Sequence, residues 1–218
     1  MKKTILVLVL ILTGTIVFAQ NGVIKELSGS VELKTPGSSS YVGAKAGDRI
    51  TRDTVISTGF RSTALVEVGS ALLTVRPLTR LTLMEIRSSA GTETLNVNLQ
   101  TGRVRVDVNP PAGTRASMIV SSPIATASVR GTSFEFDTRN LFVNNGKVNF
   151  AGNRGIAMQV PGGSSSLVQG DGKAADPVAT KREGFRPRAP VGTDASAGSK
   201  GETSAISSGI ISIDLNYF

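Results

Sequence analysis

Acidic side chains are the residues of this sequence that could most readily catalyse a reaction, because it contains neither histidine nor cysteine. Two carboxylates that flank a glycosidic bond can hydrolyse it, one as acid and the other as base or nucleophile. Ser-His-Asp and Cys-His catalysis and zinc sites built on histidine or cysteine are excluded. The acids are scattered, and several occupy polar positions of alternating segments, which is typical of a solvated sheet face. They are Asp48, Asp53, Glu67, Glu85, Glu93, Asp107, Glu135 and Asp137.

Metal and cofactor sites also find little support in the sequence. Gly170-Asp171-Gly172 could form a calcium turn, but further acidic ligands are missing nearby. A glycine-rich phosphate loop with its lysine is absent. We therefore predict no catalytic residue, no metal ligand and no cofactor, and we expect a protein that is not an enzyme.

The strongest local motif is Val129-Arg130-Gly131-Thr132. Gly131 allows the backbone to turn or to approach closely, and the five donors of Arg130 could bond several carbonyl groups and tie successive β layers together. Alternatively, Arg130 could capture a carboxylate or a phosphate. The flanking sequence is typical of a core strand, so the motif is predicted to be structural.

The elements that carry these residues are short strands. Arg103-Val104-Arg105-Val106-Asp107-Val108 alternates valines with charges, as a strand with one face on a core requires. Turn signals of Gly, Pro and Asn recur every ten or so residues, a spacing typical of a sandwich, barrel or β-roll. The sequence therefore predicts an all-β fold.

A glycine followed by an apolar-polar-apolar strand start occurs three times, at 29–33, 102–106 and 146–150. Any meander could restart its strands in this way, and so could a rolled fold whose coils restart at glycines. The predicted fold is accordingly a meandering β-roll, a solenoid-like fold or a sandwich, with a disordered C-terminal tail.

The first residues resemble a secretory signal peptide. Lys2 and Lys3 precede an aliphatic run over 5–12, and Ala19 ends a small-residue site, so cleavage is expected between Ala19 and Gln20. Retention as an anchor is the alternative, although the apolar stretch is shorter than the roughly 20 residues that span a bilayer. The protein is thus predicted to be bacterial, periplasmic or secreted, without a transmembrane span after cleavage.

The composition changes near the C-terminus. Residues 173–205 are rich in Gly, Ser, Ala and Pro and lack apolar periodicity, which predicts a flexible tail. Residues 206–218 become apolar again and could form a strand that docks on the body. The expected organisation is a signal peptide at 1–19, a β domain at 20–172, the tail at 173–205 and this short segment.

Several motifs of the β domain resemble those of the FecR family, in the family's order. The most specific stretch is 120–148, with Ser-Pro-Ile-Ala-Thr-Ala, Val-Arg-Gly-Thr-Ser-Phe and Asn-Gly-Lys-Val in sequence. Asn145 replaces a commonly acidic residue. Other matching motifs include Gly47-Asp48-Arg49-Ile50-Thr51, Ser57-Thr58-Gly59, Ser62-Thr63-Ala64-Leu65-Val66, Leu99-Gln100-Thr101-Gly102-Arg103-Val104 and Leu167-Val168-Gln169-Gly170.

The resemblance implies an extracytoplasmic β module that serves signalling and protein contact. The family's founding member has a cytoplasmic anti-sigma region and a transmembrane helix before this domain, whereas a signal peptide precedes it here, so the anti-sigma role does not transfer. We expect a binding or sensory module that contacts envelope proteins. The net charge of +8 leaves open a structural protein that binds an anionic envelope polymer. A glycan-active carboxylate enzyme is a third reading, and nucleic acid is not an expected partner.

Overall fold

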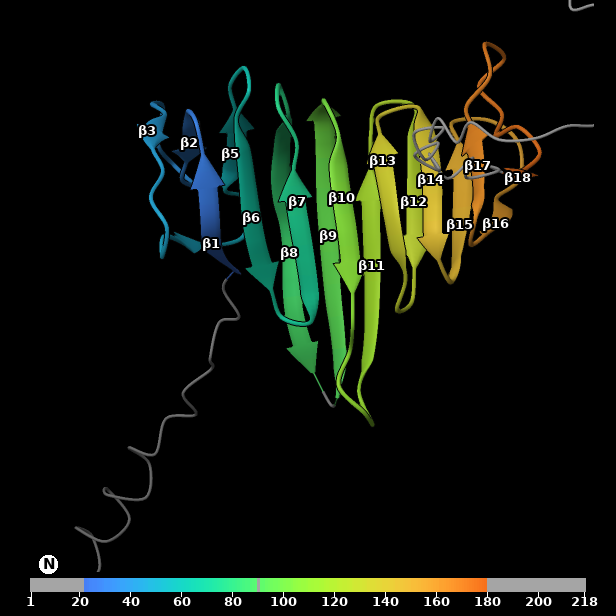
Figure 1. The fold of residues 1–218 in the computed structure, drawn as a ribbon, viewed down its shortest axis with the longest axis horizontal. Helices are drawn as coiled ribbons and strands as arrows, with labels where there is room; N and C mark the ends of the chain where they lie inside the picture. Colours follow the sequence, from blue (N-terminus) through green and yellow to red (C-terminus); the bar gives the residue numbers. More distant parts are fainter. Residues whose placement is uncertain (1–21, 90, 180–218) are drawn as a thin grey trace, which may run out of the picture. The chain divides into compact units, whose positions relative to one another are not determined.

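The computed structural model describes residues 22–89 and 91–179, which consist of strands and turns without a helix (Figure 1). The predicted all-β class is confirmed. Within these residues no helix is long and apolar enough to cross a membrane. The signal-peptide site at Ala19 and Gln20 and the segment 206–218 lie outside the described residues.

The strands form two nine-stranded sheets, which we call sheet A and sheet B. Sheet A contains, in spatial order, β4 (Arg49–Ile50), β1 (Gly22–Ser28), β6 (Thr63–Val68), β7 (Ala71–Val75), β10 (Val104–Val108), β13 (Ser133–Asp137), β14 (Asn140–Asn145), β17 (Ser164–Leu167) and β18 (Val178–Ala179). Sheet B contains β3 (Val42–Gly43), β2 (Val31–Lys34), β5 (Val55–Thr58), β8 (Arg80–Ser89), β9 (Thr92–Thr101), β11 (Arg115–Ser121), β12 (Ala125–Val129), β15 (Lys147–Gly152) and β16 (Met158–Pro161).

The chain advances along both sheets together, so the strands follow one another in nearly sequential order from blue to orange in Figure 1. Neighbouring strands are antiparallel except for β9 and β11, which are parallel. The exception follows from the connectivity. The chain leaves β9, crosses to the single strand β10 in sheet A, and returns to sheet B as β11, which runs in the same direction as β9. This arrangement combines a two-sheet sandwich with the progression of a roll.

Alternating side chains from the two sheets form one core. Val104, Val106 and Val108 are buried while Arg105 and Asp107 face outward, as the alternation predicted. Phe136 of sheet A meets Phe150 of sheet B edge to face, with ring centroids 6.0 Å apart and planes at 77°. Each fully buried large apolar side chain of this kind contributes about 1.5–3 kcal/mol. The core therefore depends on the period-two pattern on both sheets.

The recurring glycine motif marks places where the chain passes a buried hydroxyl. Gly102 has φ of +88°, and a Cβ on it would overlap Thr79, so this position requires glycine on two counts. The same relation joins Gly29 to Ser62 and Gly146 to Thr132. The motif is thus specific to crossings between the sheets, and a general hairpin restart does not explain it.

The paired structure continues beyond residue 172. β18 pairs with β17 through Ser164 opposite Ala179 and Ser165 opposite Val178. Two paired residues in a polar stretch leave no period-two pattern to detect, so this strand could not be predicted from the sequence. The first residues of the expected tail therefore belong to sheet A, and 180–205 lie outside the described part of the chain.

Candidate functional site

Two buried threonines fix the backbone of two arginines at the margin of sheet A. Thr58 in β5 donates its hydroxyl to the carbonyl oxygen of Arg76 at 2.6 Å and accepts the Thr79 N–H at 3.0 Å. Thr79 in turn donates to the Arg103 carbonyl at 3.1 Å and accepts the Arg103 N–H at 2.9 Å. Because the two arginines are anchored through backbone, their guanidinium groups remain free to reach across the sheet.

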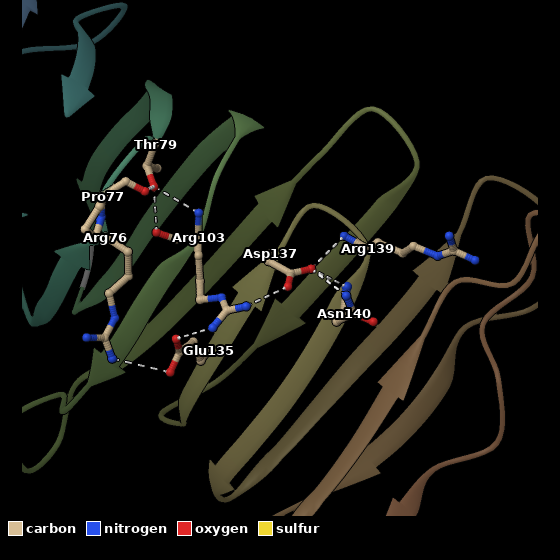
Figure 2. A network of polar contacts seen from close by, with 8 residues as sticks. All are labelled: Arg76, Pro77, Thr79, Arg103, Glu135, Asp137, Arg139 and Asn140. Carbon is tan, nitrogen blue, oxygen red and sulfur yellow. Dashed lines mark hydrogen bonds and ion pairs between the residues drawn. The ribbon is translucent and has the colours of Figure 1, made fainter. Parts of the chain in front are cut away.

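The two arginines bind two carboxylates of β13, as Figure 2 shows. Glu135 forms ion pairs with Arg76 Nη2 and with Arg103 Nη1, each at 3.6 Å. Arg103 Nη2 also contacts Asp137 Oδ2 at 3.2 Å. We call Arg76, Arg103, Glu135 and Asp137 the arginine–carboxylate ladder. Half-exposed pairs of this kind contribute about 0.2–1 kcal/mol each, so the ladder adds little stability and its arginines can exchange partners.

The ladder extends along β10, where Arg105 lies opposite Glu135 in the strand register. Arg105 Nε contacts Asp107 Oδ2 at 3.1 Å, and this hydrogen bond and the adjacent negative charge raise the pKa of the Arg105 guanidinium. Ser133 donates a short hydrogen bond to the other oxygen of Asp107. The outer face of sheet A thus places arginines and acids in contact across neighbouring strands.

Asp137 also shapes the turn between β13 and β14. Its Oδ1 accepts the backbone N–H of Asn140 at 2.8 Å and the side-chain amide at 2.9 Å. Within the turn, Arg139 Nε donates to the carbonyl oxygen of Val168 at 2.7 Å. These bonds hold the ladder beside β14 and the segment that follows β17.

Two grooves meet at the ladder and share Arg103, Glu135 and Asp137. One, of about 400 Å³, extends over β14 and β17 to the exposed side chains of Leu167 and Val178. The other, of about 770 Å³, extends to Leu78. The ladder therefore lies between exposed apolar side chains on both sides.

Leu78 has an unusual backbone for an apolar residue. Its φ is +57°, in the left-handed region that costs a non-glycine residue roughly 1–2 kcal/mol, and its side chain is 60% exposed. Strained residues persist where surrounding structure holds them, often at binding sites. Leu78 therefore presents an exposed apolar side chain beside the ladder.

The acids considered from the sequence are mostly engaged elsewhere. Glu135 and Asp137 are near each other, and Arg103 forms an ion pair with each of them where the two grooves meet. Among residues 22–89 and 91–179 no cluster of acidic side chains could hold a metal ion. The others contact separate partners: Asp48 with Lys45 N–H, Asp53 with Arg52, Glu67 with Lys25, Glu85 with Arg87 and Asn96, Glu93 with Ser70 N–H, and Asp107 with Arg105.

The Val129–Thr132 motif lies at the end of β12 on sheet B. Val129 is buried, Gly131 has φ of +67°, and buried Thr132 donates to the carbonyl oxygen of Lys147 at 3.2 Å. Arg130 is exposed, and none of its contacts within the described residues is a hydrogen bond or ion pair. The layer-tying hydrogen bond expected of Arg130 is thus made by Thr132, whose shorter side chain points inward at the crossing.

Sequence reasoning missed the ladder as a unit. The alternation of 103–108 and of 133–137 showed that the charges of each strand share a face. It could not show that β10 and β13 are neighbours, because β11 and β12 intervene in the sequence and belong to sheet B. Long-range strand pairing was the missing information.

Comparisons with known proteins give one family match. The family model described as FecR protein matches residues 54–149, a range that contains β7, β10 and β13 and so the whole ladder. No curated protein matches the sequence. Two crystal structures of a "putative anti-sigma factor from Parabacteroides distasonis ATCC 8503" are similar to it at 16% identity and a TM-score of 0.47, covering 57% of this chain and 59% of that one.

Proposed function

We propose that this chain, whose residues 54–149 match the FecR protein family model, is an exported, non-enzymatic binding module that takes part in envelope signalling by contacting another protein. The observation that carries the proposal is the outer face of sheet A, where the arginine–carboxylate ladder lies between exposed Leu78 and exposed Leu167 and Val178.

The chemistry of this face suits a protein partner. Arginine and apolar side chains are enriched in the centres of protein interfaces, where they supply hydrogen bonds and buried area. The ladder arginines are 41% and 54% exposed, so a partner carboxylate or carbonyl could replace a weak intramolecular pair. Leu78, Leu167 and Val178 supply apolar area on either side.

Export is the second component of the proposal. It is supported by the lysines and aliphatic run that precede Ala19, and it places the module in the periplasm or outside the cell. Intact-mass measurement of the exported protein should give a chain that begins at Gln20. A mass that retains Met1 would contradict cleavage.

The decisive experiment compares capture of envelope proteins by two immobilised variants. Leu167→Asp places a charge in the groove beside the ladder, and Val42→Asp places the same charge on the exposed edge strand β3 of sheet B. We expect the unmodified chain and Val42→Asp to capture the same protein, and Leu167→Asp to lose it. The captured protein should then bind the purified chain directly.

Two results would overturn the proposal. Equal capture by both variants would show that the outer face of sheet A is not the contact surface. Hydrolysis of wall glycans by the purified chain, abolished in a Glu135→Gln, Asp137→Asn double variant that still folds, would replace the binding module with a carboxylate enzyme.

A further inference from the structure

Arg130 lies between two grooves on the outer face of sheet B. One groove, of about 580 Å³, extends from Arg130 over the start of β11 to the loop after β10. The other, of about 520 Å³, extends over β15 to β16. Both are lined by Ser117, Arg130 and Gly131, so they join into one trough that crosses several strands.

Three cations line this trough without a carboxylate partner. Arg115, Arg130 and Lys147 are exposed, and across the described residues their side chains make no ion pair or hydrogen bond. Val129 pairs with Val148, which places Arg130 opposite Lys147 on the adjacent strand. Like charges on directly opposite residues are destabilising, and an anion bound between them would remove that cost.

The contrast with the other sheet is sharp. On sheet A the arginines of the ladder and Arg105 are all bound to acids. In the trough no aspartate or glutamate contributes to the described lining. The nearby acid Glu93 is engaged instead with the backbone N–H of Ser70, at 2.8 Å. The positive charge of the trough is therefore not compensated within the described part of the chain.

Uncharged hydrogen-bonding side chains fill the spaces between the cations. Within residues 22–89 and 91–179, the side chains of Ser117, Ser128, Asn149 and Gln159 are among those of the lining that make no hydrogen bond. Such groups can bond hydroxyls along a sugar chain. The described lining includes no aromatic side chain on which a nucleic-acid base could stack.

We propose that this trough binds an anionic polysaccharide, whose acidic groups contact Arg115, Arg130 and Lys147 while its hydroxyls contact Asn149 and Gln159. The joined grooves match an extended chain better than a single small anion. The inference concerns sheet B and does not rest on the protein contact proposed for sheet A. It would allow the module to hold wall polymer on one sheet and a protein on the other.

The test measures binding of the full chain to polygalacturonate, to neutral dextran and to polyglutamate at several salt concentrations. The unmodified protein should bind polygalacturonate, with an affinity that falls as salt screens the charges, and should not bind dextran. The variant Arg115→Gln, Arg130→Gln, Lys147→Gln should bind at least about tenfold more weakly, because three charge-assisted contacts are removed.

The matched control removes the same charge elsewhere. Lys45→Gln, Arg49→Gln, Arg52→Gln alters three exposed cations around β4, outside the trough, and should change affinity less than about twofold. Equal loss in both variants would show that only net charge matters and would overturn the proposal.

A second variant tests whether the ligand is a glycan. Asn149→Ala, Gln159→Ala keeps every charge and should weaken polygalacturonate binding while leaving polyglutamate binding unchanged. Polyglutamate binding as tight as that of polygalacturonate, or equal weakening of both, would contradict a polysaccharide site and indicate an acidic polypeptide instead.

Discussion

Thr79 and Arg103 are joined by a reciprocal pair of hydrogen bonds, from the Thr79 hydroxyl to the Arg103 carbonyl at 3.1 Å and from the Arg103 N–H to the Thr79 oxygen at 2.9 Å. Thr79 is buried and precedes β8 of sheet B, whereas Arg103 precedes β10 of sheet A. A buried hydroxyl on one side of the sandwich therefore fixes the backbone of the central arginine of the ladder on the other.

Replacing Thr79 with valine should destabilise the protein while keeping the side-chain volume. The backbone groups of Arg103 would lose their partner, at a cost of about 1–3 kcal/mol in the free energy of unfolding. Urea denaturation measures the change, and Thr79→Ser is the control because it keeps the hydroxyl. A valine variant no less stable than the serine variant would show that these hydrogen bonds contribute nothing.

Gly102 should be far less tolerant of alanine than a glycine with similar backbone in open space. Gly102→Ala combines φ of +88° with a Cβ that would overlap Thr79, so we expect a loss above about 2 kcal/mol. Gly113 has φ of +83° with no atom within 4 Å of an added Cβ. Gly113→Ala should lose only the roughly 1–2 kcal/mol of backbone strain. Equal losses would mean that the close approach to Thr79 has no energetic effect.

The sequence predicted the class of fold because its signals are local. The valines of 104–108 and the phenylalanines at 134 and 136 alternate with charges, and their burial confirms the pattern. The FecR motifs likewise lie in short consecutive strands and turns, and the match at 54–149 confirms those that fall within that range.

What the sequence could not predict depends on contacts between distant segments. Arg103 and Asp137 are 34 positions apart and meet only because β10 and β13 are adjacent in sheet A. Arg130 was predicted to make the hydrogen bond that Thr132 makes. Both residues flank the same glycine, and only the fold decides which of the two side chains points inward. Pairing of β18 depends on β17 in the same way.

Leu78 gives a variant that should separate stability from binding. Asparagine tolerates the left-handed backbone better than leucine, so Leu78→Asn should match or exceed the stability of the unmodified protein by up to about 1 kcal/mol. It also removes an exposed apolar contact beside the ladder, so capture of the protein partner should fall. Thermal unfolding and the capture assay measure the two effects.

The control for Leu78 is Ile124→Asn, which removes another exposed apolar side chain, 38% exposed, at a position without positive φ. It should bring no gain in stability and no loss of capture. If Leu78→Asn were as destabilising as a core substitution, the side chain would be packing against the body and would not be available to a partner.

Arg130→Ala should leave the stability of the protein almost unchanged. An exposed side chain without a hydrogen bond or ion pair to any described residue has little to lose on truncation, so the change in unfolding free energy should stay within about 0.5 kcal/mol. Urea denaturation of the variant and of the unmodified protein checks this expectation. A larger loss for Arg130→Ala would restore the layer-tying role that the sequence suggested, and it would remove the argument that Arg130 is held ready for an anionic ligand.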